Sequence, residues 1–380
     1  MSPVTALTIV GAGPAGASAA LGARAADPSL EVTLLDRADF PRDKSCGDGV
    51  APHVLDLLEG VGVTGLLDDR EPVTTLSLTR GGRGVERLMA RPAYVVPRTV
   101  LDARLVEAAQ AAGATLVRHR VRDLAELDEA AVVVGADGAH SVLRKALGQP
   151  QGATALAIRG YAPTPAGHEG TQRIVFGGAD GADGRGGPQP TYAWSFDRGD
   201  GLANVGYGEL LRDGHRAPTK ARLLARLEEL LPGSTAGGTD WVGHHLPLST
   251  AHWHPADGRV LLVGDAAGLV NPMTGEGIFY AVATGLAAGR AAAEAIAAGD
   301  PASAGRRYAR ATRPILARHL RHTALASRLC RSGRVLDAGL RASARDQRVF
   351  DDLVELGLAR GRITPSLARA LATSYLAPTR

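Results

Sequence analysis

The sequence of 380 residues predicts an α/β protein that combines a parallel sheet, an inserted antiparallel sheet and a C-terminal helical region. Three observations predict this class. The chain opens with an apolar run, a glycine-rich turn and a stretch of helix formers, which is a βαβ beginning. Residues 151–254 alternate short apolar runs with turn residues, as antiparallel strands do. Residues 301–380 are helical in pattern throughout.

Five short runs rich in aliphatic residues are expected to supply the parallel sheet. They occupy 6–10, 31–36, 114–121, 130–138 and 258–268. Helices are expected at 15–26 and 101–113, the second ended by Gly113. Within the inserted region, the segment 177–190 holds six glycines and two prolines, so we expect a mobile loop there.

The first glycine-rich turn, GAGPAG at 11–16, satisfies G-x-G-x-x-G between a strand and a helix. Gly11 permits the tight turn, Gly13 lets the backbone approach a pyrophosphate, and Gly16 lets the helix pack close to the strand. Unpaired N–H groups at the start of the helix would bind the phosphates. The turn therefore predicts a dinucleotide site.

Asp36 ends the second strand, 20 residues after Gly16, where a carboxylate can accept hydrogen bonds from ribose hydroxyls. An acid at this position favours an unphosphorylated ribose. The dinucleotide is therefore FAD or NAD rather than NADP.

Three further motifs decide between FAD and NAD. They are PRTVLDARL (97–105), VVVGADGAHSVLR (132–144) and the Gly264-Asp265 turn followed by AAGLVNPMTGEGIFYA. In this order they resemble the Arg-x-x-x-Asp helix start, the DG turn and the ribitol-binding segment of the para-hydroxybenzoate-hydroxylase-like flavoproteins. The resemblance implies FAD.

The stretch PRDKSCGDGV (41–50) resembles the Cys-Gly-x-Gly loop of the geranylgeranyl reductase family within that superfamily. TYAWSFDRGDGLANVGYG (191–208) resembles the family's Tyr-x-Trp-x-Phe-Pro…Asn-Val-Gly strand pair, and GLVNPMTGEGI (268–278) resembles its flavin-side loop. One departure is Asp197, which stands where the family has proline; it bears on the substrate more than on the chemistry.

The resemblance implies a Rossmann-type FAD-binding domain, of the glutathione-reductase-2 and para-hydroxybenzoate-hydroxylase kind, with an inserted antiparallel substrate domain and a C-terminal helical region. The FAD-binding domain would be discontinuous and comprise 1–70, 96–150 and 256–300. The substrate domain would comprise 71–95 and 151–255, and the helical region 301–380.

The resemblance also implies which residues contact FAD, several through small side chains or backbone N–H groups. Together with the first glycine turn, these are Gly11, Gly13, Ala15, Gly16, Asp36, Arg37, Cys46, Gly47, Gly49, Arg98, Val121, Asp265, Gly277 and Ile278. On the inserted sheet, Tyr192, Trp194 and Phe196 would line an apolar substrate pocket; packing of an ordinary sheet face explains them equally well.

Cys46 is the tentative catalytic residue, and two roles for it stay open. A thiol beside the flavin could gate the substrate pocket or help deliver a proton, with thiolate character favoured by Lys44 or Arg42. Alternatively, Cys46 is a small apolar residue whose backbone contacts FAD.

Composition indicates the cellular compartment of the protein and the kinds of partner it could bind. Two cysteines leave no disulfide framework, and the N-terminus lacks a basic leader, so a cytoplasmic protein is expected. Residues 301–380 hold 16 arginines and five acidic residues, a basic tail that favours peripheral membrane contact or an anionic substrate. A solvated arginine-rich helical face explains the tail equally well. Nucleic acid is not expected, because the tail has few aromatic residues and no binding module.

A cluster of histidines could indicate a metal site. It consists of His244, His245, His252 and His254. Cysteine and carboxylate ligands are missing nearby, so surface or packed histidines are expected and no metal is predicted.

The resemblance implies an FAD-dependent oxidoreductase that reduces carbon–carbon double bonds of a hydrophobic, isoprenoid substrate by hydride transfer from reduced flavin. Because no second dinucleotide domain is evident, NAD(P)H would dock transiently, or a reduced redox partner would deliver the electrons. Two alternatives remain. One is an FAD-dependent monooxygenase that hydroxylates or epoxidises a small hydrophobic secondary metabolite, and the other is a flavin-free prenyl-binding escort protein.

Overall fold

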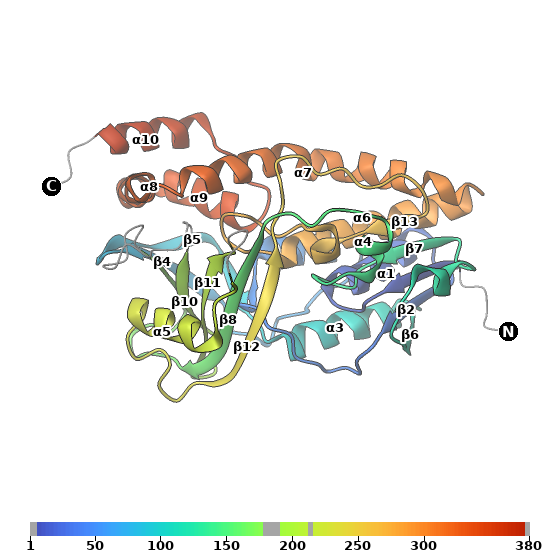
Figure 1. Cartoon of the computed structure of the whole chain (residues 1–380), viewed down its shortest axis with the longest axis horizontal. Helices are drawn as coiled ribbons and strands as arrows, with labels where there is room; N and C mark the ends of the chain where they lie inside the picture. The colour runs from blue at the N-terminus through green and yellow to red at the C-terminus, as the bar shows by residue number, and fades with distance from the viewer. Residues whose placement is uncertain (1–5, 178–190, 212–215, 377–380) are drawn as a thin grey trace.

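The computed structural model describes residues 6–177, 191–211 and 216–376. At one end of the molecule lies a five-stranded, fully parallel sheet with the order β13-β7-β1-β2-β6 (Figure 1). Its strands are β1 (Leu7–Val10), β2 (Val32–Asp36), β6 (Thr115–Arg118), β7 (Val132–Gly135) and β13 (Val260–Leu262). The strand order changes direction at β1, which is where such sheets bind ligands at the carboxyl ends of their strands.

Helices cover this sheet and set the position of the glycine turn. They are α1 (Pro14–Ala26), α3 (Arg98–Ala111), α4 (Val142–Ala146) and α6 (Ile278–Ala297). Helix α1 starts directly after β1 with a proline in its first turn, a position where the missing N–H is not needed. It packs against both α3 and α6, so the phosphate-binding turn is held between strand and helices.

The second sheet has eight strands in the order β12-β8-β11-β10-β9-β4-β5-β3 and is antiparallel except for the β4–β9 pair. Its strands are β3 (Gly49–Val50), β4 (Val73–Arg80), β5 (Arg83–Val95), β8 (Thr154–Pro163), β9 (Thr171–Phe176), β10 (Tyr192–Asp197), β11 (Leu202–Leu210) and β12 (Thr239–Pro247). Strand β3 is the end of the Cys46 stretch, so that stretch is built into the edge of this sheet.

The remaining helices include a C-terminal layer. They are α2 (Pro52–Glu59), α5 (Lys220–Leu230), α7 (Ala304–Leu329), α8 (Gly333–Arg345), α9 (Gln347–Leu358) and α10 (Pro365–Leu376), with short 3₁₀ turns at Leu124–Leu127, Gly264–Ala267 and Pro301–Ser303. Figure 1 shows α7 along one side of the molecule and α8, α9 and α10 stacked over the antiparallel sheet. Leu340 and Phe350 join an apolar cluster with β4 and β5, and Arg80 on β4 bonds Asp337 on α8 at 2.8 Å.

The predicted fold class is confirmed, with differences in detail. The helix expected at 101–113 begins earlier, at Arg98, because the residues after Pro97 already turn. The strand expected at 114–121 is confined to Thr115–Arg118, because it pairs only with β2 at the edge of the sheet. Residues 178–190, most of the predicted mobile loop, lie outside the described residues.

Close backbone packing between α1 and α6 depends on glycine. A Cβ atom at Gly289 would lie 1.9 Å from the carbonyl oxygen of Ala19, and one at Gly285 would lie 2.2 Å from that of Ala15. Real Cβ atoms do not approach backbone oxygens so closely. The two helices therefore stack at a distance that larger residues would prevent.

We predict that Gly289→Ala lowers the free energy of unfolding by about 1–3 kcal/mol, because the added methyl group forces the two helices apart. Urea denaturation measures this loss. Gly339→Ala on α8 is the matched control, since its Cβ would meet nothing nearer than a Leu371 side-chain atom at 3.7 Å. There the better helix propensity of alanine should leave stability unchanged or raise it by up to about 1 kcal/mol. Equal losses in both variants would contradict the packing argument.

Candidate active site

A cavity of about 890 Å³ lies between the two sheets and the C-terminal helices. One wall is the edge of the parallel sheet with its two glycine turns. A second wall is the antiparallel sheet, and a third consists of α7 to α10. This volume is at the upper end of the range for small-molecule sites.

The first glycine turn has the geometry that the sequence predicts. Gly11 has φ +96°, and a Cβ there would lie 2.3 Å from the Ala136 carbonyl oxygen. At Gly16 a Cβ would lie 1.8 Å from the Gly11 oxygen, so Gly16 serves helix packing and does not border the cavity. A Cβ at Gly13 would point toward the Arg42 guanidinium at 3.1 Å. Gly13 thus leaves room beside a cation.

Apart from Gly16, every residue predicted to contact FAD or substrate borders this cavity. From the parallel-sheet half these are Gly11, Gly13, Ala15, Asp36, Arg37, Arg98, Val121, Asp265, Gly277 and Ile278; from the Cys46 stretch, Cys46, Gly47 and Gly49; and from β10, Tyr192, Trp194 and Phe196. Asp36 also has a structural task, because its carboxylate accepts the backbone N–H of Ala12 at 2.8 Å and so holds the glycine turn.

Two arginines lie beside Gly13, fixed by one fully buried carboxylate. Asp102 accepts two hydrogen bonds from Arg98, at 2.6 and 2.8 Å, and pairs with Arg42 at 3.2 Å. Burial alone would lower the pKa of Arg98, but the ion pair with Asp102 outweighs it and the pKa is raised. The Arg98 guanidinium is therefore held as a cation, and with Arg42 it places two guanidinium groups next to the turn predicted to bind a pyrophosphate.

The second glycine turn presents Asp265 to the cavity. Its carboxylate pairs with Lys44 at 3.0 Å and lies 3.9 Å from His244. Burial would raise the pKa of Asp265, but Lys44 and His244 outweigh burial and hold it well below its usual range. Asp265 is therefore ionised and able to accept hydrogen bonds from hydroxyl groups.

The thiolate character that one of the two open roles gave Cys46 is not favoured by the surroundings of the thiol. Burial raises the pKa of the Cys46 thiol, and the lowering effects of Arg98 and Lys44 do not compensate. The sequence placed cations near the thiol correctly but could not show that the side chain is desolvated. Cys46 is a neutral thiol that lies against the Arg98 guanidinium.

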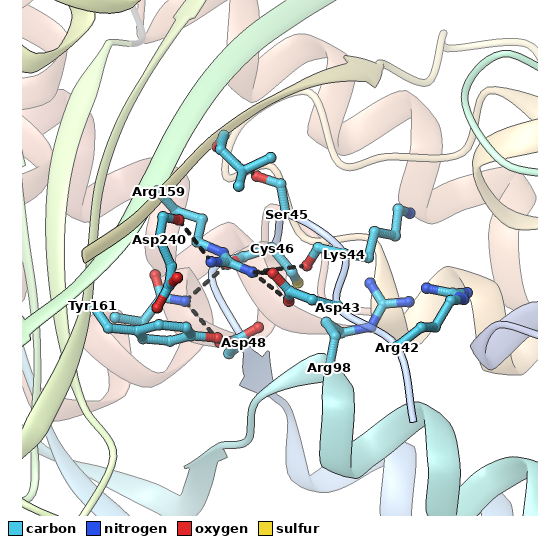
Figure 2. A network of polar contacts seen from close by, with 12 residues as sticks. Arg42, Asp43, Lys44, Ser45, Cys46, Asp48, Arg98, Arg159, Tyr161 and Asp240 are labelled. Atoms are coloured by element: carbon cyan, nitrogen blue, oxygen red, sulfur yellow. Dashed lines mark hydrogen bonds and ion pairs between the residues drawn. The ribbon is translucent and has the colours of Figure 1, made fainter. Parts of the chain in front are cut away.

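Beneath the Cys46 stretch lies a buried polar network (Figure 2). Asp48 accepts hydrogen bonds through Oδ2 from Tyr161 at 2.7 Å and from Asn204 at 2.8 Å. Asn204 also donates to the Cys46 carbonyl at 2.8 Å. Arg159 holds the start of the stretch through Asp43 at 2.6 Å. Burial raises the pKa of Asp48 to about 6 despite these donors.

The side chains of β10 that face the cavity form an aromatic row. Tyr192, Trp194 and Phe196 alternate along the strand, with neighbouring ring centroids 5.9 and 6.3 Å apart. The indole N–H of Trp194 donates to Asn204 at 2.8 Å, which orients the ring. The tyrosine hydroxyl of Tyr192 donates to the Thr274 carbonyl on the second glycine-rich loop.

The C-terminal layer closes the cavity and holds the loop at 271–277. Asn271 donates to the carbonyls of Leu356 and Gly357 at 3.2 and 3.1 Å, and Thr274 donates to Gly357 at 2.7 Å. The cavity wall on this side is almost wholly apolar. Its residues include Ala326, Leu329, Cys330, Val335, Leu336, Leu340, Leu353, Leu358, Ile363, Leu367 and Leu371.

Arg42 and Lys44 were expected near Cys46 from the sequence, but this apolar wall and the polar partners Asp48 and Asn204 were missed as parts of the site. Asp48 was visible inside the quoted Cys-Gly-Asp-Gly run, and Asn204 inside Asn-Val-Gly. Nothing local relates two residues 156 positions apart, however, so only the folded chain reveals their pairing.

The predicted histidine cluster is partly at the cavity. His244 and His245 lie close to His140, with ring centroids 6.5 and 5.5 Å apart. Across residues 6–177, 191–211 and 216–376, no group of three or more His, Cys, Asp or Glu side chains is arranged to hold a metal ion.

Comparison with known proteins places this chain in a family. Residues 4–323 match the family model described as an FAD binding domain. The chain is 35% identical over 327 residues to the menaquinone reductase of Mycolicibacterium smegmatis, covering 77% of this chain and 76% of that protein. It is 32% identical over 341 residues to digeranylgeranylglycerophospholipid reductase 1 of Methanopyrus kandleri, covering 77% of this chain and 82% of that protein.

The solved structures agree. A geranylgeranyl bacteriochlorophyll reductase-like protein from Thermoplasma acidophilum has a TM-score of 0.78 at 20% identity, covering 97% of this chain and 96% of that one. The chain belongs to the geranylgeranyl reductase family of FAD-dependent oxidoreductases. This confirms the resemblance on which the sequence-based prediction of an FAD enzyme depended.

The residues present fit the FAD that this family uses. Helix α1 begins at the cavity after Gly13, and no side chain caps its N-terminus. It therefore directs positive potential and backbone N–H groups into the cavity. Helix α6 also begins at the cavity, after Gly277, but there the Glu276 carboxyl group accepts the backbone N–H of Phe279 at 2.8 Å. Arg42 and Arg98 add two charges beside Gly13. An anionic pyrophosphate suits this arrangement, and we expect the predicted contacts to hold the dinucleotide.

We predict that Gly13→Ala weakens FAD binding about 10-fold or more, because the methyl group would occupy the space beside Arg42. Flavin content after purification and titration of the apoprotein with FAD measure this. Gly243→Ala is the matched control, since its Cβ would meet only the Ala157 oxygen at 3.7 Å and the residue does not border the cavity. Equal flavin affinity in both variants would contradict this position for the pyrophosphate.

A second prediction concerns stability and pH. Because burial raises the pKa of Asp48 from 3.8 to about 6, folding favours its protonated form. That contribution is full below pH 3.8 and is lost as the pH rises through about 6. Relative to wild type, Asp48→Asn should therefore gain about 2 kcal/mol in free energy of unfolding between pH 4 and pH 7. Urea denaturation at both pH values measures the difference; a constant difference would contradict the burial argument.

Proposed function

We propose that this enzyme uses reduced FAD to saturate carbon–carbon double bonds of an isoprenoid lipid. One observation carries the proposal: a single cavity joins the dinucleotide turns to an apolar chamber under α7–α10, and the Cys46 stretch lies between the two parts. A polyprenyl chain could fill the chamber while one double bond lies beside the flavin. An apolar chamber of this kind would hold little polar substrate.

The relatives support this substrate class. Those named menaquinone reductase and digeranylgeranylglycerophospholipid reductase act, by their names, on lipids that both carry polyprenyl chains with double bonds. The shared chemistry is the unsaturated isoprenoid chain rather than the head group. We therefore assign the chain, and no particular head group, as the feature that this enzyme recognises.

The protein would position the cofactor and the substrate and exclude water from the site. When bound and reduced, FAD supplies the hydride. Trp194, fixed by Asn204, and its neighbours on β10 would orient the alkene across the sheet. The apolar faces of α8 and α9 would exclude water and prevent side reactions. Arg42, Arg98, Asp36 and Asp265 would hold the dinucleotide so that the reacting atoms meet.

We further propose that electrons come from NAD(P)H or a reduced redox partner, and that the enzyme works at a membrane surface in the cytoplasm. The structure supports the membrane contact through exposed apolar side chains on two basic helices. These are Leu325, Leu329, Tyr375 and Leu376, and Leu329 is both 42% exposed and a border residue of the cavity. Among the described residues, no helix is long and apolar enough to cross a bilayer.

The experiment that tests the function is anaerobic reduction of the purified enzyme, followed by addition of a polyprenyl menaquinone or a digeranylgeranylglycerophospholipid. We expect flavin absorbance to return with the lipid alone and mass spectrometry to show a gain of two hydrogens in the polyprenyl chain. Reoxidation that needs oxygen and yields an oxygenated product would instead establish a monooxygenase.

Gly339→Leu sharpens the assignment to the chain. Gly339 borders the apolar chamber, and a Cβ there would meet only a Leu371 side-chain carbon, at 3.7 Å. The variant should slow reoxidation by a long polyprenyl substrate about 10-fold while a short-chain analogue reacts as before. Equal effects on long and short chains would place the substrate elsewhere.

A further inference from the structure

We propose that Asp48 stores the proton that the reduction consumes and passes it to the cavity through the Cys46 thiol. This inference rests on the proposed function, because saturation of a double bond takes up one hydride and one proton. It assigns a task to a carboxyl group that the family resemblance leaves unexplained.

Asp48 is fully buried, and its two carboxyl oxygens differ in their hydrogen-bond partners. Oδ2 accepts hydrogen bonds from Tyr161 and Asn204. Oδ1 is buried as well and has no hydrogen-bond partner among the described residues. A buried carboxylate with one oxygen unsatisfied costs more free energy than the neutral carboxylic acid, because burial penalises the charge most. The geometry therefore favours a stored proton.

The backbone of Asp48 indicates that its side chain is needed. The residue has φ +60°, a left-handed conformation that costs about 1 kcal/mol for residues with a Cβ, although glycine stands on both sides of it. Its carbonyl oxygen accepts the N–H of Val96 at 2.8 Å, which fixes this conformation. Glycine would adopt it without strain. A carboxyl group at such a position, bordering the cavity, points to a chemical task.

The neighbouring thiol connects Asp48 to the cavity. The Cys46 sulfur accepts the backbone N–H of Asp48 and lies against the Arg98 guanidinium. Burial keeps this sulfur protonated at rest, and both donors would stabilise it when it loses its proton. Cys46 thus has a proton to give, charge stabilisation when it gives it, and an acid two residues away to restore it.

In the proposed reaction, one alkene carbon takes a hydride from the reduced cofactor. The other alkene carbon takes the Cys46 proton, so the S–H bond breaks as a C–H bond forms. The thiolate then takes the proton of Asp48. The Asp48 carboxylate recovers a proton by way of Tyr161, which is partly exposed. No further oxidant or reductant is required.

Charged and titratable groups from each neighbouring element bear on this acid. Arg159 and Tyr161 face it from β8, Arg98 faces it from α3, and Cys46 lies in its own stretch. Both arginines favour the carboxylate, and burial outweighs them. Because the arginines offset part of the effect of burial, the pKa of Asp48 stays in a range where its proton can be transferred near neutral pH.

The test is the variant Asp48→Asn, which keeps an oxygen for Tyr161 and Asn204 and tolerates the left-handed backbone but carries no transferable proton. In single-turnover reoxidation of the prereduced enzyme by polyprenyl menaquinone, we expect a rate about 100-fold lower than wild type. The wild-type rate should fall as the pH rises above about 6, and the variant should lack this dependence. Cys46→Ala should be slow too, and the double variant no slower than the slower single.

Asp197→Asn is the matched control. Asp197 is also buried and accepts an O–H from Thr164 and an N–H from Gly170, but it does not border the cavity. Its variant should keep the wild-type pH profile. All variants are compared at equal flavin content, so loss of cofactor does not imitate loss of a proton.

A readout without turnover completes the test. Infrared difference spectra of the oxidised protein, without substrate, should show the C=O band of a protonated carboxylic acid that titrates near pH 6. The component that titrates near pH 6 should disappear in Asp48→Asn and persist in Asp197→Asn, whereas buried Glu276, whose pKa is raised by burial to about 7, gives a separate component in both variants. A wild-type pH profile and rate in Asp48→Asn would overturn the inference and leave the proposed function standing. If no polyprenyl compound reoxidises the wild-type enzyme, the proposed function fails and the proton-delivery role with it; the infrared band then shows only whether Asp48 is protonated.

Discussion

Asn204 is the side chain on which the arrangement of this site depends. It is fully buried on β11, donates both to the Cys46 carbonyl and to Asp48, and accepts the Trp194 N–H. One amide therefore joins the Cys46 stretch, the buried acid and the aromatic face that would orient a substrate. A buried network of this kind is stable only when its members are satisfied together, so it specifies one position of the Cys46 stretch.

The two ends of the cavity serve different physical needs. At the dinucleotide end, Arg42, Arg98 and the N-terminus of α1 concentrate positive potential where we expect a pyrophosphate to bind. At the far end, the faces of α8 and α9 offer almost only apolar side chains. Asn271 couples the two ends, because it fixes the flavin-side loop by bonding the end of α9. Positions of cofactor and substrate chamber are thereby tied to one another.

Much of the dinucleotide half was predictable because its geometry is local. The spacing of Gly11, Gly13 and Gly16 determines a turn and a helix start within six residues, and Asp36 follows one strand later. The resemblance then extended the prediction to residues that all border the cavity apart from Gly16. The state of Cys46 could not be predicted in the same way, since burial raises its pKa against the effect of nearby cations, and burial is a property of the whole fold.

The sequence by itself determined the fold class and the family and predicted which residues would contact a flavin dinucleotide, because motif spacing translates directly into turns, strands and helix ends. Only the tertiary structure decided that the basic C-terminal helices form the apolar wall of the cavity, and that Asp48 meets Tyr161 and Asn204 beneath the thiol. These contacts join residues more than 100 positions apart. Their energies come from shared burial, which no short stretch of the chain encodes alone.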